Sequence, residues 1–386
     1  MKISGPELVE YGNLVRYEVN IISEYLGTKT LFYELEKKYM YMVSDNVDAA
    51  LVGLLMPAMY YGEDIYVEGK VSEKLYWDTS YRLQKLLQTF MPLLNQISVY
   101  TENTIPGNEP IQEGECVTGF SGGIDSFCTL ADYFYDPLCP KSSKVTMLTY
   151  NNVGSHWGDE EGYHLFLRKY EKLSRVASKI GLPFVKINSN LDDFYINENL
   201  RFTKTLVMRN ASVALLLQKG VKKFLHSSSL PYEHLMVKNS VQQMTQIEPF
   251  VLQILSSCDD IEILSVGSEY SRVEKTEIVS NIEHSYEFLD VCTTEGKDKT
   301  NCSACVKCLR TLTTLEILGA LELYSESFNL EIYKKNKNRF LGKVLVQNDE
   351  FTKEIYDLAQ KKKFAFPVMS YLYSLYYKLR YLIRKR

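Results

Sequence analysis

Residues 119–126 of the chain read Gly-Phe-Ser-Gly-Gly-Ile-Asp-Ser, and this stretch decides which fold we expect for the rest of the sequence. A short apolar run, 116–120, leads into it, and a run typical of a helix, 124–135, starts within it. A strand, a glycine-rich turn and a helix in this order aim several backbone N–H groups and the positive end of the helix at one place. Two adjacent glycines also let the backbone approach a phosphate without an intervening Cβ. The stretch therefore predicts an anion-binding site.

The side chains of this stretch indicate which kind of anion to expect. Ser121 and Ser126 add hydroxyl donors, whereas Asp125 places a carboxylate next to the expected phosphate. A carboxylate and a phosphate need a metal ion between them, so we expect Mg²⁺ on the pyrophosphate of a nucleotide. The alternative is a Ser/Gly turn that only caps an ordinary helix, but Asp125 has no capping use at its position.

Two common phosphate-binding patterns do not fit the stretch. The Walker A motif ends in Gly-Lys-Ser/Thr, and no Lys follows these glycines; the Gly-x-Gly-x-x-Gly pattern of dinucleotide-binding domains is also missing here. Ser-Gly-Gly-x-Asp-Ser after a strand instead resembles the PP-loop of the ATP pyrophosphatases. This resemblance implies an enzyme that cleaves ATP between its α and β phosphates.

Length and composition limit the number of domains, the partners and the location that we expect. With 386 residues the chain is longer than one typical domain, so two or three domains are expected. A net charge of −4 gives no reason to expect nucleic acid as a partner. We find neither the pattern of a signal peptide nor a run of about 18 uncharged apolar residues, so we expect a cytoplasmic protein.

Changes of pattern along the chain predict three domains. Residues 1–112 combine short strands, among them a hairpin over 31–43, with helices such as 48–61, which indicates an α+β domain. That domain either binds the substrate or a partner, or only packs on the next domain. Strands and helices alternate over 113–322, which is typical of an α/β domain with a parallel sheet. Residues 323–386 are expected to form a helical extension.

Further residues are expected near the glycine-rich stretch because parallel sheets bind ligands at the carboxyl ends of their strands. Three more strands of the α/β domain end in polar runs, at 150–152, 188–190 and 226–229. Arg209 lies on a helix from which it could reach a phosphate from a second direction. The alternative for Arg209 is a solvated position on the helix face.

A cluster of cysteines predicts a metal site. Four thiols fall within seventeen residues at Cys292, Cys302, Cys305 and Cys308. Tetrahedral zinc takes four thiolate ligands, and Cys-x2-Cys spacing lets two of them reach one ion. An iron–sulfur cluster of the bacterial ferredoxin type would need a Cys at position 312, which is Leu312. We therefore expect Zn²⁺ in a structural site, since four thiolates leave no open coordination position.

The two motifs together resemble the family of 7-cyano-7-deazaguanine synthase, the PP-loop enzymes of queuosine precursor synthesis. Runs of similar sequence occur at 207–210, Val-Met-Arg-Asn, and at 275–279, Lys-Thr-Glu-Ile-Val, and the resemblance covers about residues 115–320. It implies an adenine nucleotide alpha hydrolase-like domain that uses ATP, Mg²⁺ and Zn²⁺, and it favours a phosphate contact for Arg209. The residues that it implies are catalytic are Asp125, Ser126, Arg209 and Lys275. Those that it implies bind the nucleotide are Gly119, Ser121, Gly122, Gly123, Ile124, Asp125, Ser126 and Tyr150.

The resemblance also implies a reaction. Enzymes of that family adenylate a carboxylate with ATP, let ammonia displace AMP to give an amide, and use a second ATP to form a nitrile. This chain departs from the family's turn after its second strand, at 150–154, and from the family's segment that helps to bind the deazaguanine, at 229–234. We therefore expect an ATP-dependent ligase with a different carboxylate acceptor, which is a deazaguanine-like base, another small molecule, or a peptide or protein. Ammonia or another amine is the expected nucleophile, and a homodimer is the expected assembly.

Two other functions stay open at this point. A PP-loop sulfurtransferase would use the same adenylated intermediate and would need a reactive thiol, for which Cys128 and Cys258 are the candidates. A nucleotide-binding module without turnover is the second alternative, although Ser121, Asp125 and Ser126 are all present.

The run 369–386 alternates aromatic or aliphatic residues with Lys and Arg. This pattern predicts an interfacial helix on an anionic membrane surface, or a nucleic-acid or partner contact. The alternative is a terminal helix that packs on the N-terminal domain.

Overall fold

The computed structural model describes residues 1–106, 114–156, 158–237, 243–256, 261–292 and 299–384. The chain forms two compact units, each built from two stretches of sequence. Unit 1 holds residues 1–119 and 137–266, and unit 2 holds residues 120–136 and 267–386. This division differs from the three consecutive domains expected at 1–112, 113–322 and 323–386.

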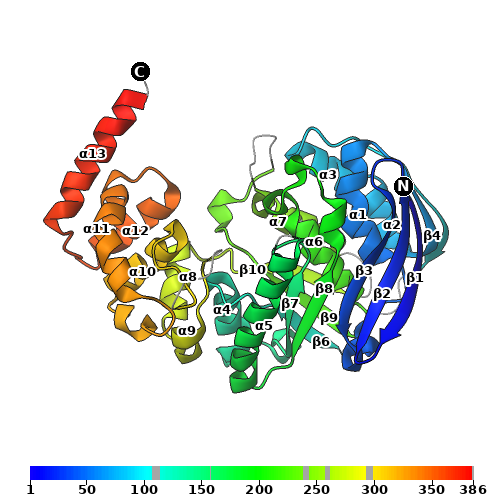
Figure 1. Cartoon of the computed structure of the whole chain (residues 1–386), viewed down its shortest axis with the longest axis horizontal. Coiled ribbons are helices and arrows are strands. Elements are labelled where there is room, and N and C mark those ends of the chain that lie inside the picture. The colour runs from blue at the N-terminus through cyan, green and yellow to red at the C-terminus, as the bar shows by residue number, and fades with distance from the viewer. Residues whose placement is uncertain (107–113, 157, 238–242, 257–260, 293–298, 385–386) are drawn as a thin grey trace. The chain divides into compact units, whose positions relative to one another are not determined.

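Unit 1 is built on one mostly parallel sheet of ten strands (Figure 1), so the α/β class is confirmed. The strands, in sheet order, are β10 (Glu262–Val266), β9 (Val221–Ser227), β6 (Glu115–Gly119), β7 (Met147–Asn152), β8 (Phe184–Ser189), β3 (Gly27–Glu36), β2 (Leu14–Ser23), β1 (Lys2–Tyr11), β4 (Ile65–Ser72) and β5 (Val99–Ile105).

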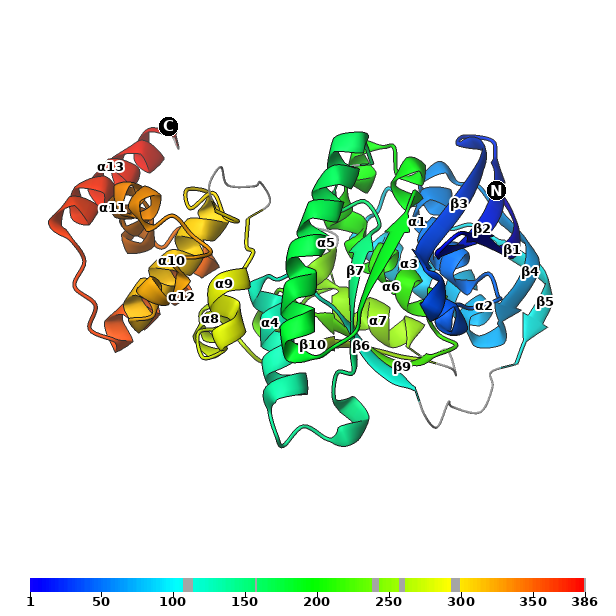
Figure 2. The ribbon, with the colours of Figure 1, turned by 60° about the horizontal axis from the view of Figure 1, so that its bottom comes forward.

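The five strands from β10 to β8 are all parallel. Helix α5 (Glu160–Ile180) connects β7 to β8, whereas α6 (Phe202–Leu216) and α7 (Glu248–Leu255) lie on the connections to β9 and β10. Crossover connections are right-handed, so strands added on opposite sides of β6 place α5 on one face and the other two helices on the opposite face (Figure 2). The direction of addition changes between β6 and β9, where open α/β sheets bind ligands.

The N-terminal strands extend this sheet instead of forming a domain of their own. β1, β2 and β3 form an antiparallel meander, and β3 pairs with β8, where Tyr33 lies opposite Ser189. The hairpin expected over 31–43 is wrong, because β3 pairs with β2 and Lys37–Met42 is a 3₁₀ helix.

The helix expected over 48–61 is confirmed as α1 (Asp48–Tyr61), and nearly all of its side chains are buried. It packs on α6 and also contacts α2 and β4, and burial on most sides suits its largely apolar sequence. The shorter helices α2 (Glu73–Ser80) and α3 (Arg82–Phe90) follow β4.

A buried polar network ties the start of α1 to the residue two positions past α6. The fully buried Asp48 carboxylate accepts hydrogen bonds from the Ser72 N–H at 2.9 Å, from Asn46 Nδ2 at 2.9 Å and from Gln218 Nε2 at 3.0 Å. Gln218 Nε2 also donates to Ser44 and Asn46. Burial raises the pKa of Asp48, and these donors oppose that effect.

Unit 2 is helical in its described residues. Helix α4 (Ile124–Leu130) continues into a π-helical turn, Ala131–Tyr135. The other helices are α8 (Arg272–Val279), α9 (Glu283–Phe288), α10 (Val306–Leu318), α11 (Leu330–Val346), α12 (Glu350–Lys361) and α13 (Val368–Arg384). Because α11 and α12 pack on α10, the expected boundary at 322 does not separate two bodies.

We predict that Gln218→Met lowers the free energy of unfolding of unit 1 by about 2 kcal/mol, because it leaves the buried Asp48 with one donor fewer. Chemical denaturation followed by circular dichroism measures this. Gln96→Met, at an exposed position of the same unit, is the matched control and should change stability by less than about 0.5 kcal/mol. Equal losses in both variants would contradict a structural role for the network.

Candidate functional site

The turn between β6 and α4 has the local structure that the glycines predicted. Gly122 has a left-handed φ of 71°, which a residue with a Cβ rarely adopts. Ser126 Oγ donates to the Gly123 carbonyl at 3.1 Å, and Ser121 Oγ accepts the Gly123 N–H at 3.4 Å. Helix α4 begins at the next residue, Ile124. Both serines and both glycines therefore gather at the start of one helix.

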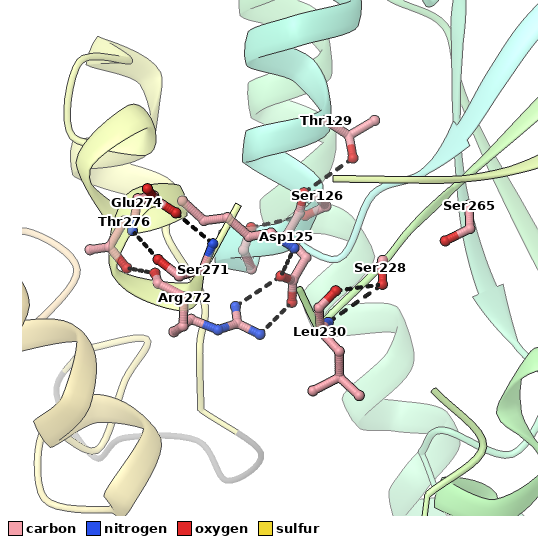
Figure 3. Close-up of polar contacts among 12 residues, drawn as sticks. Asp125, Ser126, Thr129, Ser228, Leu230, Ser265, Ser271, Arg272, Glu274 and Thr276 are labelled. Carbon is pink, nitrogen blue, oxygen red and sulfur yellow. Dashed lines mark hydrogen bonds and ion pairs between the residues drawn. The ribbon is translucent and has the colours of Figure 1, made fainter. Parts of the chain in front are cut away.

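The carboxylate of Asp125 is held by two cations from α8, Arg272 and Lys275, and Figure 3 shows the contact with Arg272. Arg272 Nη1 lies 2.9 Å from Oδ1 and Arg272 Nη2 donates to Oδ2 at 3.0 Å, which is the two-pronged geometry of a strong guanidinium–carboxylate pair. The buried Lys275 Nζ lies 3.2 Å from Oδ1. The structure thus brings together two predicted residues, Asp125 and Lys275, and adds Arg272, which the sequence analysis did not name.

A capping box fixes the start of α8. Ser271 Oγ accepts the Glu274 N–H at 3.3 Å, and the Ser271 N–H donates to Glu274 Oε2 at 2.8 Å (Figure 3). Arg272 and Lys275 therefore lie in the first turn, at the positive end of the helix. Cations are unfavourable there unless an anion is close. The start of α8 is consequently a second feature that favours an anion at this place.

Arg310 of α10 adds a third cation to this part of unit 2. Its guanidinium stacks on the Phe351 ring at 3.6 Å from the centroid. Burial, and after it the charge of Arg272, lower the pKa of Arg310 to about 10, whereas the carboxylates of Asp349, Glu354 and Asp125 oppose that shift. Two guanidinium groups that repel each other would both be stabilised by a bound anion.

The four predicted cysteines form one cluster in unit 2. Their sulfur atoms all lie within 4.8 Å of one another, with pairs at 3.8 Å (Cys292–Cys305), 3.8 Å (Cys302–Cys308) and 3.4 Å (Cys305–Cys308). Four ligands at the usual zinc–sulfur distance stand about 3.8 Å apart in a tetrahedron. The donor set therefore fits a metal such as zinc, and no disulfide joins the described cysteines.

Backbone groups support the cluster as they do in thiolate metal sites. The Cys305 N–H donates to the Cys302 sulfur at 3.3 Å, and the Cys308 N–H donates to the Cys305 sulfur at 3.5 Å. Buried Asn301 accepts the N–H groups of Val291 and Cys292 at 2.9 and 3.1 Å. It therefore fixes Cys292 next to the other three ligands, a role that no spacing rule in the sequence reveals.

The cysteine cluster is connected to the glycine-rich turn through one short segment. The Asp290 N–H donates to the Gly122 carbonyl at 2.7 Å, only two residues before Cys292. On the other side, Cys305 is the N-cap of α10, the helix that carries Arg310. A metal in the cluster would thus fix both the turn and the start of the helix that carries Arg310.

Unit 1 contains the other predicted site residues, at the carboxyl edge of its sheet. Gly119 ends β6, and the polar ends of β7 and β8 lie side by side, with Asn152 Nδ2 donating to Asn188 Oδ1 at 2.8 Å. Buried Tyr150 shares a hydrogen bond of 2.9 Å with His156 Nε2 and stacks on Phe166. Tyr150 therefore serves as a packed part of this edge.

Arg209 has a different environment from either of those expected. It is buried, and its guanidinium donates to Thr205, to the Val153 and Leu200 carbonyls and to Asp192, the last at 2.5 Å. The guanidinium also stacks on the Tyr195 ring. A solvated position is wrong, and these contacts favour a structural role in unit 1 over a phosphate contact.

A histidine–carboxylate pair lies at the same edge of unit 1, and the sequence analysis missed it. His226, at the end of β9, has its Nε2 3.3 Å from Oε2 of the fully buried Glu248. Ser265 of β10, which is in register with His226, donates to the other carboxylate oxygen at 2.7 Å. A polar run after a strand indicated this edge, but only the fold places Glu248 there.

Of the two candidate thiols for sulfur transfer, Cys128 and Cys258, the structure describes only the first. Burial raises the pKa of Cys128 to about 12, so its thiol is protonated at neutral pH and is a poor nucleophile. Cys258 lies outside the described residues.

Comparisons of the chain with protein-family models, with curated proteins and with solved structures gave no match. Within the described residues, no helix combines the length and the apolar character that are needed to cross a membrane.

We predict that the purified protein contains about one equivalent of zinc, bound by the four thiolates. Metal analysis by mass spectrometry, with chelator titration, measures this. Cys305→Ser should lose most of the metal and unfold unit 2 at lower temperature, whereas Cys139→Ser, outside the cluster, should keep both. Iron in place of zinc, or full metal content in Cys305→Ser, would contradict the assignment.

The carboxyl group of Asp132 predicts how the stability of unit 2 depends on pH. Burial, followed by the charge of Glu269, raises its pKa to about 6; Asp136 acts in the same direction, while Tyr270 and Lys275 oppose it. The folded state therefore binds this proton more tightly than an unfolded chain does, so the stabilisation is complete below about pH 4 and is lost as the pH rises through 6.

Asp132→Asn removes that titration. Because the carboxyl is only half buried, we expect the variant to gain about 1 kcal/mol over the wild type between pH 4 and pH 7.5. Thermal unfolding at several pH values measures the difference. A difference that does not depend on pH would show that Asp132 does not titrate in this range.

Proposed function

We propose that unit 2 binds ATP at the turn 120–126 and that the chain is an ATP-dependent ligase that forms AMP and pyrophosphate. The observation that carries the proposal is the pair of cations, Arg272 and Lys275, on Asp125 at the start of α4. Backbone N–H groups of a glycine-rich turn, the starts of two helices and two cationic side chains lie together at Asp125. This combination suits a polyphosphate.

In this proposal Asp125 positions the two cations. Both of its oxygens contact Arg272 or Lys275, so its charge is already offset and it is a weaker ligand for Mg²⁺ than a phosphate would be. We therefore assign Mg²⁺ to the phosphates of the nucleotide, where it would offset their charge. Arg272 and Lys275 would stabilise the charge that develops on departing pyrophosphate.

The chemistry follows from the leaving group. A carboxylate oxygen of the acceptor attacks the α phosphorus, the bond to the β-bridging oxygen breaks, and pyrophosphate leaves. An amine nitrogen then attacks the acyl carbon, AMP departs with the former carboxylate oxygen, and the proton of the amine goes to solvent. With ammonia the product is an amide, and a second adenylation on the amide oxygen would give a nitrile.

Several classes of carboxylate acceptor are compatible with this reaction. The segment 229–234, which differs from the resembled family, ends in a short 3₁₀ helix of unit 1, Tyr232–His234, with Tyr232 exposed. A deazaguanine-like carboxylate, another small carboxylate and a peptide or protein carboxylate are the candidates. Sulfur transfer is less favoured because Cys128 is protonated.

A product assay tests the proposal. The protein would be incubated with ATP, Mg²⁺, ammonium and 7-carboxy-7-deazaguanine, and AMP, pyrophosphate and the base would be measured by mass spectrometry. We expect Lys275→Met and Asp125→Asn to lower AMP formation at least about 100-fold, since each weakens the phosphate clamp. Lys334→Met, an exposed lysine of the same unit, should stay within about twofold.

The outcomes are distinct. Unchanged AMP formation and unchanged ATP affinity in Lys275→Met, with the metal content of the wild type, would refute the site. Tight ATP binding without conversion of the base would support the site and direct the search to peptide carboxylates.

A further inference from the structure

Most apolar residues of helix α13 face solvent, whereas a helix that only packs on the protein would turn them toward the protein. Helix α13 lies along α11 in unit 2 (Figure 1). The residues that face the protein are Ser370 and Ser374, which are buried, and Tyr373 and Tyr377, which are half-buried. Six of the residues that face solvent, all exposed, are Val368, Met369, Tyr371, Leu372, Leu375 and Leu379.

The packing against α11 is close and specific. A Cβ at Gly342 would lie 2.5 Å from the Cβ of Tyr373, so the glycine is what lets the two helices approach. Arg339 Nε donates to the Tyr377 hydroxyl at 3.2 Å. The orientation of α13 is therefore fixed by contacts of its polar face, and its apolar face is left outward.

Charge surrounds the apolar face in a regular way. At about 100° per residue, the exposed Lys378 and Arg380 fall on opposite flanks of the stripe formed by Val368, Leu372, Leu375 and Leu379. Over 361–386 the sequence contains eight Lys or Arg and no Asp or Glu, although the whole chain has a net charge of −4. Leucine and tyrosine on one face, with basic residues on both flanks, are typical of helices that lie in a membrane interface.

We propose that the outward face of α13 binds the surface of a membrane that contains anionic lipids. The helix would lie parallel to the surface, with its leucines and aromatic rings at the boundary between the headgroups and the acyl chains. Lys378 and Arg380 would reach the anionic headgroups from either side. Such binding needs no membrane-spanning helix, and it does not depend on the proposed ATP chemistry.

A second copy of the chain fits this face less well. In a symmetric contact between two α13 helices, the basic flanks of one copy would lie next to those of the other, and no acidic residue of 361–386 could pair with them. Nucleic acid would meet a leucine stripe before it met a phosphate-binding group. Charge complementarity therefore favours the lipid surface.

Vesicle sedimentation with the full-length protein tests the inference. We expect the wild type to sediment with phosphatidylcholine vesicles that contain phosphatidylglycerol, and to do so at least about tenfold less with phosphatidylcholine alone or at high salt. Leu372→Glu/Leu375→Glu should abolish binding, and Lys378→Gln/Arg380→Gln should weaken it about tenfold. The control is Leu93→Glu/Leu323→Glu, whose leucines are 43% and 48% exposed against 57% for both Leu372 and Leu375.

Three results would overturn the proposal. The first is a wild type that stays in solution with every vesicle, and the second is a control double variant that loses binding as fully as Leu372→Glu/Leu375→Glu. The third is a dimer in size-exclusion chromatography that becomes monomeric in Leu372→Glu/Leu375→Glu without any lipid binding, which would make a second copy the occupant. Circular dichroism and metal content would show that each variant is folded.

Discussion

The carboxylate of Asp125 is the charge on which the arrangement of unit 2 depends. The starts of α4 and α8 both present positive ends, and α8 adds Arg272 and Lys275 in its first turn. Without an anion these groups would repel one another. Asp125 lowers that cost in the unliganded protein and holds both cations in one orientation. A polyphosphate would thus enter a place whose donors are already arranged, which is the condition for electrostatic catalysis.

The cysteine cluster gives this arrangement its mechanical support. Residues 289–292 carry both a metal ligand and the Asp290 N–H that binds Gly122, and the helix that begins after Cys305 carries Arg310. Irregular backbone of this kind cannot bury enough apolar surface to be rigid by itself. Thiolate ligation supplies free energy of folding at such a place. A metal there would affect the proposed ATP binding only by fixing the position of the turn, without contact with the nucleotide.

Local patterns allowed much of the fold to be predicted from the sequence. The bounds of α1 follow from composition, and the glycine turn and the four cysteines follow from spacing. Long-range pairing did not follow, because an antiparallel contact such as β3 with β8 leaves no mark on either strand alone. Because local patterns carry no information on long-range contacts, some residues of the candidate site could not be predicted either. Residue type marks Arg209 and Arg272 alike as phosphate candidates, yet the fold buries the first against Asp192 and sets the second on Asp125.

Helix α13 shows why an amphipathic pattern specifies two faces but not their orientation. A hydrophobic stripe of leucines ordinarily predicts the side that packs on the core. Here the close approach at Gly342 is made by the backbone of Tyr373 and Ser374 and by the Tyr373 Cβ, so the face opposite the leucines packs on α11 and the leucines stay outside. The cations of the two proposed binding regions also differ in their surroundings. Those at Asp125 are largely buried and paired, which suits one specific anion, whereas Lys378 and Arg380 are exposed and spaced around a helix, which suits a continuous anionic surface.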